Sequence, residues 1–298
     1  MRTTPVAVAT NMAEEPTPDT ELAASSQRAH LGAVKRARRR ATIVVRSSQA
    51  LLVVVAMLAW ELGTRAGVFN SFFVGSPSIE ARLLGDKLSS DLIPAAALTL
   101  GETAVGFAIG NLVGISIGLL LWYWPTLARV LDPFLVALGA IPILALAPLL
   151  IVWFGTGFSS KVILAALSCV LVALTQAYRG ARSVDGDLIR LMESFGARKP
   201  VIFRKMVLPS AASSVAAALK LNIGFALIGA VIGEFISSDQ GLGHIILVAG
   251  ANFNLPLVIL GVLCLSFLAI VMNLAVGALE RYLLRWETAP RNDVRWQG

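Results

Sequence analysis

Residues 185–200 read Asp-Gly-Asp-Leu-Ile-Arg-Leu-Met-Glu-Ser-Phe-Gly-Ala-Arg-Lys-Pro, a polar stretch between two long apolar blocks. Asp185 is a good helix N-cap, and Asp187 adds a negative charge to the first turn, where the helix dipole favours it. Gly196 suits the left-handed position just past a helix end. Pro200 can open a second helix because its missing N–H is not needed there. The stretch therefore predicts a helix, a glycine and a second helix.

The first of these helices carries one apolar stripe. Its members recur at i, i+3, i+4 and i+7: Leu188, Leu191, Met192 and Phe195. Arg190 and Glu193 flank the stripe, and Pro209 is placed to stop the second helix. From these residues alone, the segment is either an ordinary charged loop or a segment that another protein holds.

The rest of the chain has the composition of a membrane protein. Hydrophobic residues make up 56% of the 298 residues, and the mean hydropathy is +0.76, which is too high for a soluble domain pair. The uncharged runs are long enough to cross a bilayer at about 20 residues per span. We predict an all-α membrane protein with six transmembrane helices, near residues 44–63, 103–128, 133–160, 162–178, 213–233 and 254–279.

Basic residues give the expected orientation. With six spans, twenty Lys and Arg residues lie on the side that holds both termini and the loop 179–209, and four lie on the other side. Cytoplasmic loops carry such an excess, so we expect both termini in the cytoplasm. The formal charge of +7 then requires no nucleic acid. Residues 1–45 have no apolar periodicity and predict a disordered tail, whose basic run 35–40 suits an anionic membrane surface.

Inside the spans, small and polar residues stand out. A glycine recurs every fourth residue in the second span, at Gly106, Gly110, Gly114 and Gly118. This face permits close helix packing, either within the chain or against another subunit. Prolines bend membrane helices and free carbonyl groups, and polar groups at membrane depth are functional candidates. The candidates for a solute pathway are Pro142, Pro148, Asn222 and Glu234.

Several kinds of site are absent from the sequence. Cys169 and Cys264 lie in apolar runs, which indicates buried thiols and no disulfide. The two histidines and two cysteines have no metal-ligand spacing, and no phosphate-binding loop of the Gly-x-x-x-x-Gly-Lys-Ser/Thr type occurs. We therefore expect no cofactor and no ATP bound by this chain. The spans offer no convincing catalytic set, and the chain has no duplicated halves of the kind expected in an ion-coupled carrier.

The segment after residue 185 resembles the EAA loop of ABC importer permeases. That loop runs Glu-Ala-Ala, three residues, Gly, nine residues and an Ile-x-x-Pro ending. In this sequence Gly196 and Pro209 fall in register, and Met206 takes the Ile position. Arg190-Leu191-Met192 stands in place of Glu-Ala-Ala, and Glu193 lies three residues too late to be the family's acid.

Further segments are similar to permeases that import taurine, aliphatic sulfonates and nitrate. They are Ile141–Leu149, Trp153-Phe154-Gly155, Ser237–Gly243 and Leu279-Glu280-Arg281. The similarity covers residues 46–286 and leaves 287–298 as a cytoplasmic tail. It implies a type I importer fold with five core helices and one N-terminal helix.

The resemblance also implies a function and partners. We expect the non-catalytic transmembrane subunit of an ABC importer in the plasma membrane, for a small anion such as a sulfonate, taurine or nitrate. Riboflavin- or pyrimidine-type permeases are the alternative, followed by an ion-coupled secondary transporter. The expected partners are separate ATPase subunits, an extracytoplasmic binding protein and a second permease copy. The residues expected to couple to the ATPase are Leu188, Arg190, Leu191, Met192, Glu193, Phe195, Gly196 and Pro209.

Overall fold

The computed structural model describes residues 43–283, and these residues are almost entirely helical. The chain divides into two compact units, Met1–Leu62 and Gly63–Gly298. The first unit contains most of an apolar helix, Ile43–Arg65, which is long enough to cross a membrane. Residues 43–45, placed in the tail by the sequence, are therefore already helical. The predictions for the rest of the N-terminal tail and for residues 287–298 lie outside the described residues.

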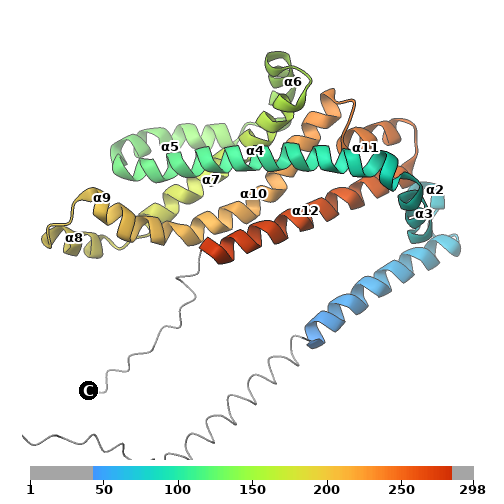
Figure 1. Ribbon diagram of the computed structural model, residues 1–298, viewed down its shortest axis with the longest axis horizontal. Coiled ribbons are helices and arrows are strands. Elements are labelled where there is room, and N and C mark those ends of the chain that lie inside the picture. Colours follow the sequence, from blue (N-terminus) through green and yellow to red (C-terminus); the bar gives the residue numbers. More distant parts are fainter. Residues whose placement is uncertain (1–42, 284–298) are drawn as a thin grey trace, which may run out of the picture. The chain divides into compact units, whose positions relative to one another are not determined.

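The second unit is built around three long helices that pack against one another, α4 (Ile93–Leu120), α7 (Phe158–Arg182) and α10 (Leu208–Ser237). A fourth long helix, α12 (Leu255–Leu283), packs against α10 (Figure 1). The shorter elements are α2 (Ser71–Val74), α3 (Pro77–Lys87), η1 (Leu88–Leu92), η2 (Leu121–Tyr123), α5 (Pro125–Gly139), α6 (Ile143–Phe154), α8 (Gly186–Ser194), α9 (Lys199–Ile202), η3 (Phe203–Val207) and α11 (Leu242–Ala251).

The glycine face of α4 packs against α7. A Cβ atom added at Gly106, Gly110, Gly114 or Gly118 would lie closer than van der Waals contact to backbone or Cβ atoms of α7. The missing side chains thus let two helix backbones approach closely over four successive turns. Of the two uses that the sequence left open for this face, packing within the chain is the one that the structure shows.

Five helices of the described chain are long and apolar enough to span a membrane, and there are six if a bent pair counts as one span. The bent pair is α5 and α6, whose axes differ by 90°. Pro142 lies at the bend in an extended conformation with ψ 119° and serves as the N-cap of α6. The third predicted span is therefore broken, because a proline cannot continue the hydrogen-bonding pattern of α5.

Two other boundaries differ from the prediction. Glu102 and Lys161 mark the edges of predicted spans, but both lie inside helices and are buried. Pro209 does not stop a helix, because α9, η3 and α10 run on as one helix, Lys199–Ser237. It is the second residue of α10 and follows the π-helical turn η3, in which the Leu208 N–H bonds to the Phe203 carbonyl. The proline thus lies where the hydrogen-bond pattern changes, so its missing N–H is tolerated.

Candidate functional site

The short helix α8 lies at one end of the bundle, between α7 and α9 (Figure 1). The Asp185 side chain caps its start by accepting a 2.9 Å hydrogen bond from the Asp187 N–H. At its end Gly196 has φ +79°. The Ala197 N–H donates to the Met192 carbonyl at 3.0 Å, and the Gly196 N–H donates to the Glu193 carbonyl at 2.9 Å. This is a Schellman motif, and both ends of α8 have the geometry that the sequence predicts.

The predicted apolar stripe of α8 divides into two faces. Met192, together with Ile189, packs on a core cluster centred on Ala181, Ile202 and Val207. That cluster also includes aromatic side chains, so this face fixes α8 against its own bundle. Met192, which the resemblance places among the ATPase-coupling residues, thus packs against the permease's own bundle.

The other face of α8 is exposed. Leu188, Leu191 and Phe195 are 49%, 51% and 79% exposed. The bundle covers only one part of the apolar surface of α8, so the other part is available for another contact. We refer to these three side chains together as the exposed face.

Charged residues surround the exposed face. Arg190 lies 3.6 Å from Asp187, and both side chains are at least 80% exposed. An ion pair that is open to solvent contributes little to stability. Glu193 is also exposed. These charges can set the register of a contact, whereas the apolar side chains supply most of its free energy.

Asn222 lies in the middle of the bundle and joins three helices. Its Nδ2 donates to Asn111 Oδ1 of α4 at 2.6 Å and to the Cys169 carbonyl of α7 at 3.1 Å. The Cys169 thiol donates in return to the Asn222 carbonyl at 3.4 Å. Asn222 and Asn111 are buried. Within the chain, Asn222 therefore faces its neighbours in the core rather than an open path.

Glu234 is the centre of a second buried network. Its carboxylate accepts hydrogen bonds of 2.6 Å from the Thr99 hydroxyl and from the Gly243 N–H. The Leu242 N–H in turn donates to the Thr99 hydroxyl at 3.0 Å. The carboxylate thus caps the start of α11, where the helix dipole favours a negative charge. Glu102 lies beside Glu234 in the same buried region.

The four pathway candidates are not brought together. Asn222 and Glu234 are fully buried, whereas Pro142 and Pro148 are exposed on α6 and at its start. Among residues 43–283, no three His, Cys, Asp or Glu side chains are grouped so that they could hold a metal ion. The structure therefore offers α8, rather than a set of catalytic or metal-binding side chains, as the main candidate site.

Comparison with known proteins decides the family. Residues 110–286 match the family model described as the inner membrane component of binding-protein-dependent transport systems. The chain belongs to this family of ABC importer permeases. It is accordingly a non-catalytic, multi-pass subunit of the inner membrane that works with a separate ATPase and a binding protein.

The curated relatives of the permease are named for different solutes. A riboflavin transport system permease of Chloroflexus aurantiacus is 32% identical, over 80% of this chain and 89% of that protein. A formylaminopyrimidine transport permease of Halalkalibacterium halodurans is 31% identical, over 79% and 94%. The taurine permease of Escherichia coli is also 31% identical, over 64% and 69%.

A solved structure supports the fold. A permease chain of the MetNI methionine ABC transporter, in an inward-facing conformation, aligns with a TM-score of 0.57 at 19% identity. The alignment covers 64% of this permease and 95% of that chain. The all-helical importer fold that the sequence predicted is thus confirmed.

Sequence reasoning missed several residues of the permease's buried networks. Thr99 and Asn111 were not singled out, and Glu102 and Lys161 served only as span boundaries. Lys161 donates from its ammonium group to the Thr156 carbonyl and, at 3.4 Å, to the Ser237 carbonyl. Counting charges along a sequence treats such residues as ends of spans, because their buried partners lie on other helices.

Proposed function

We propose that the permease couples to its ATPase through the exposed face of α8. One observation carries this proposal: Leu188, Leu191 and Phe195 are exposed on a helix that is not among the candidate spans. Exposed leucines on the long helices can face lipid across the bilayer, whereas α8, with nine residues, is too short to span it. Covering each apolar side chain gains about 1.5–3 kcal/mol, so a groove in a partner protein is the natural cover for this face.

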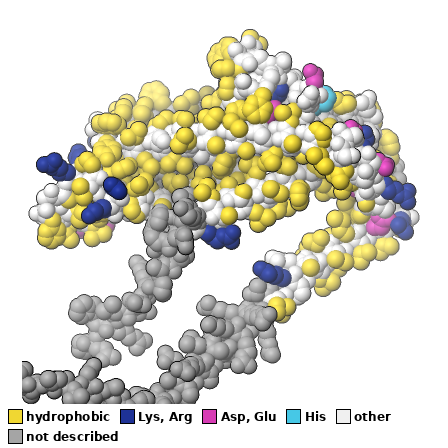
Figure 2. Space-filling view, viewed as in Figure 1, with side chains coloured by type: hydrophobic (Ala, Val, Ile, Leu, Met, Phe, Trp, Pro, Cys, Tyr) yellow, Lys and Arg dark blue, Asp and Glu magenta, His cyan; other side chains and the backbone are white. Residues whose placement is uncertain are grey.

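The proposed orientation places α8 in the cytoplasm. Figure 2 shows Lys and Arg side chains at the end of the second unit that holds α8 and α9, and also at the end that holds α2 and α3. The basic residues of the segment that holds α8 and α9 are Arg190, Arg198, Lys199, Arg204 and Lys205. An excess of basic residues marks the cytoplasmic side of a membrane protein. The ATPase also works on this side, so the basic residues and the exposed face both support a cytoplasmic contact between α8 and the ATPase.

The solute pathway forms, in this proposal, between two copies of the permease. The polar groups Asn222 and Glu234 are buried within each copy and hold its helices together, so a path through a single copy has no polar lining from them. ATP-driven closure of the ATPase pair moves the two α8 helices, and the two rigid bundles then open outward to the binding protein. Gly196 and the helix Lys199–Ser237 connect α8 to the bundle core.

The proposed solute is a small anion such as a sulfonate, taurine or nitrate. The segments after Ile141 and Ser237 that resemble sulfonate and nitrate permeases support it, as does the taurine relative. The riboflavin relative supports a larger heterocyclic solute as the alternative. Uptake of labelled taurine and labelled riboflavin, in cells that depend on this permease, distinguishes the two because only one label should accumulate.

Replacing Phe195 by alanine tests the coupling proposal. In reconstituted transporter, Phe195→Ala should lower solute uptake and binding-protein-stimulated ATP hydrolysis at least tenfold, because about 2 kcal/mol of apolar contact is lost. Phe267→Ala is the matched control, since Phe267 is 64% exposed on α12, far from α8 along the chain. If Phe195→Ala instead unfolds the isolated permease and leaves coupled hydrolysis unchanged, the exposed face belongs to the membrane domain.

A further inference from the structure

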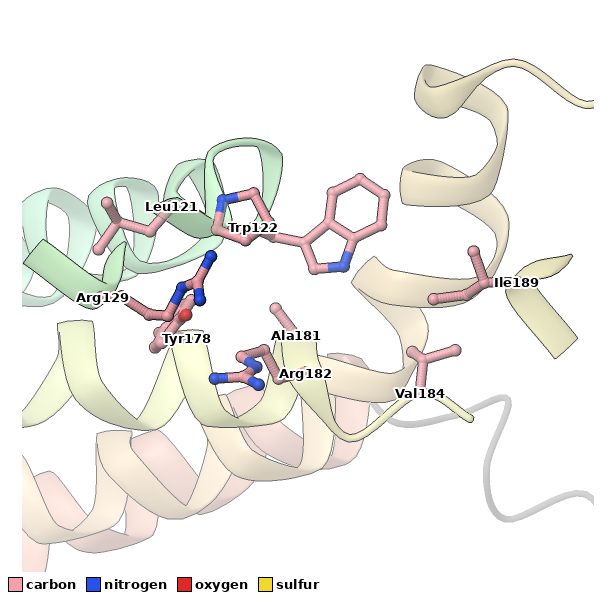
Figure 3. A pocket seen from close by; sticks show the side chains of 9 residues that line it. Leu121, Trp122, Arg129, Tyr178, Ala181, Arg182, Val184 and Ile189 are labelled. Atoms are coloured by element: carbon pink, nitrogen blue, oxygen red, sulfur yellow. The ribbon is translucent and has the colours of Figure 1, made fainter. Parts of the chain in front are cut away.

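A pocket of about 360 Å³ lies next to α8, where the end of α7 meets η2 and the start of α5. Figure 3 shows Arg129, Tyr178 and Arg182 grouped toward one end of it, and Val184 and Ile189 toward the other. A second pocket of about 460 Å³ shares Leu121, Tyr178 and Arg182 with the first. The two pockets therefore adjoin along α5 and α7, and we refer to them together as the groove.

The groove is basic at its rim. Arg129, Arg179 and Arg182 line it, together with a single acid, Asp132. No ion pair within residues 43–283 involves any of these three arginines. The Arg182 guanidinium lies 5.7 Å from the centre of the Tyr178 ring, which orients it by a cation–π contact. Three arginines that form no ion pair with any acid of the described chain can bind an anion that carries several oxygen atoms.

The inner part of the groove is mostly apolar, and Thr175 beside Leu174 is its polar member. Leu135 and Val136 of α5 face Leu174 of α7 across it. Leu174 lies eight residues before Arg182 on α7, which is about 12 Å along the helix. The groove thus runs from a charged rim at the end of the bundle into the part of the helices that lies in the membrane. A small soluble anion would fill the rim and leave these walls uncovered.

We propose that this groove binds an anionic phospholipid of the cytoplasmic leaflet. The phosphate lies among the three arginines, and one acyl chain lies between α5 and α7. Basic pockets between membrane helices on the cytoplasmic side are suited to such headgroups. The assignment to this leaflet rests on the cytoplasmic orientation of α8 under Proposed function.

The binding test uses the purified full chain in a neutral detergent, without ATPase or ATP. The probes are phosphatidylglycerol and phosphatidylcholine with brominated acyl chains, which quench tryptophan fluorescence. Trp122 lines the pocket, so the part of the quenching that disappears in Trp122→Phe reports on the groove. The variant is the double substitution Arg129→Gln with Arg182→Gln. The matched control is Lys205→Gln, an exposed basic residue in η3 that is not part of the groove.

The expected result is that phosphatidylglycerol quenches Trp122 at a concentration about tenfold lower than phosphatidylcholine does, since it carries a net charge that the arginines can pair. The double variant should lose this preference and still be quenched by phosphatidylcholine, which shows that it is folded. Lys205→Gln should retain the preference. Because no ATPase is present, failure here leaves the coupling proposal intact, and failure of Phe195→Ala leaves this one intact.

Three results would overturn the proposal. One is equal quenching by the two lipids, and another is an unchanged preference in the double variant. The third is full displacement of phosphatidylglycerol by inorganic phosphate at the same concentration, which would assign the arginines to a soluble anion. The proposal would also be wrong if the double variant, in pure phosphatidylcholine, no longer co-purified with the ATPase. The arginines would then be part of the ATPase contact.

Discussion

At the scale of single residues, Glu234 connects three helices. It lies on α10, accepts a hydrogen bond from Thr99 of α4 and caps α11 through the Gly243 N–H. Removing the carboxylate leaves the buried Gly243 N–H without an acceptor, which costs about 1–3 kcal/mol. The Thr99 hydroxyl would lose one of its two acceptors and could still donate to the Ala95 carbonyl at 3.0 Å. Glu234 is therefore more important for stability than its place among the pathway candidates suggests.

Glu234→Ala should lower the thermal unfolding midpoint of the detergent-purified permease by several degrees. Glu234→Gln should lower it less, because the amide oxygen can still accept one of the two hydrogen bonds. Unfolding is followed by intrinsic fluorescence, with solute uptake measured in parallel. A Glu234→Ala protein with normal stability but no uptake would contradict the structural role and return Glu234 to the pathway.

Gly196 is the other residue whose conformation matters. Its φ of +79° costs a residue with a side chain roughly 1–2 kcal/mol, and a β-branched residue more. Gly196→Val should therefore disturb the end of α8 and reduce ATPase co-purification, with normal insertion of the permease. Gly186→Val is the control, because Gly186 lies in the same segment without a positive φ and with open space around it. Equal losses in both variants would show that bulk in the loop, rather than backbone conformation, is the cause.

At the scale of elements, the sequence predicted α8 and its caps well. The signals for that helix are local, since an N-cap and a C′ glycine act within a few residues. The split of its apolar stripe could not be predicted, because periodicity identifies an apolar arc but not the neighbour that covers each part. Ile189 and Met192 are covered by residues as distant in sequence as Trp122.

The boundaries of the membrane helices were also only partly predictable, because they depend on neighbours that are distant in sequence. Charge spacing located the spans but misplaced the start of α4, because Glu102 is buried beside a residue far along the chain. The break between α5 and α6 has a visible cause in Pro142, yet Pro133 and Pro148 lie inside helices without breaking them. Which proline separates two helices depends on the packing around it.

The glycine face of α4 gives a prediction for a helix pair. Gly110→Leu should push α4 away from α7, because its Cβ alone would overlap the Ala166 carbonyl and approach Cys169. We expect poor folding, measured as a loss of monodisperse protein in detergent, since overpacking typically costs about 1–3 kcal/mol or more. Gly277→Leu on α12 should be tolerated, as nothing lies within 4 Å of a Cβ there. Normal folding of Gly110→Leu would mean that the two helices are not tightly packed.

At the scale of the whole permease, exposed apolar helix surfaces and charged helix ends are both what a membrane-spanning protein requires. Leu112 of α4 and Leu274 of α12 are 70% and 68% exposed, which in water would be an extensive apolar surface. A lipid bilayer and a second permease copy can cover it. The basic ends then lie in water on either side, and the side with more of them becomes the cytoplasmic one.

The topology can be tested with two single cysteines, at Ser183 and Gln240, in a background without Cys169 and Cys264. Both positions are exposed. Ser183 directly follows α7, whose 25 residues span about 37 Å, more than the roughly 30 Å of a bilayer core. Gln240 lies near the other end of α7, because Lys161 in its first turn donates to the Ser237 carbonyl at 3.4 Å. The two thiols should therefore label from opposite sides in intact cells, Gln240→Cys from outside and Ser183→Cys only after permeabilisation. Labelling of both from outside would place α8 outside the cell, where no ATPase could reach it, and the coupling proposal would fail with the topology.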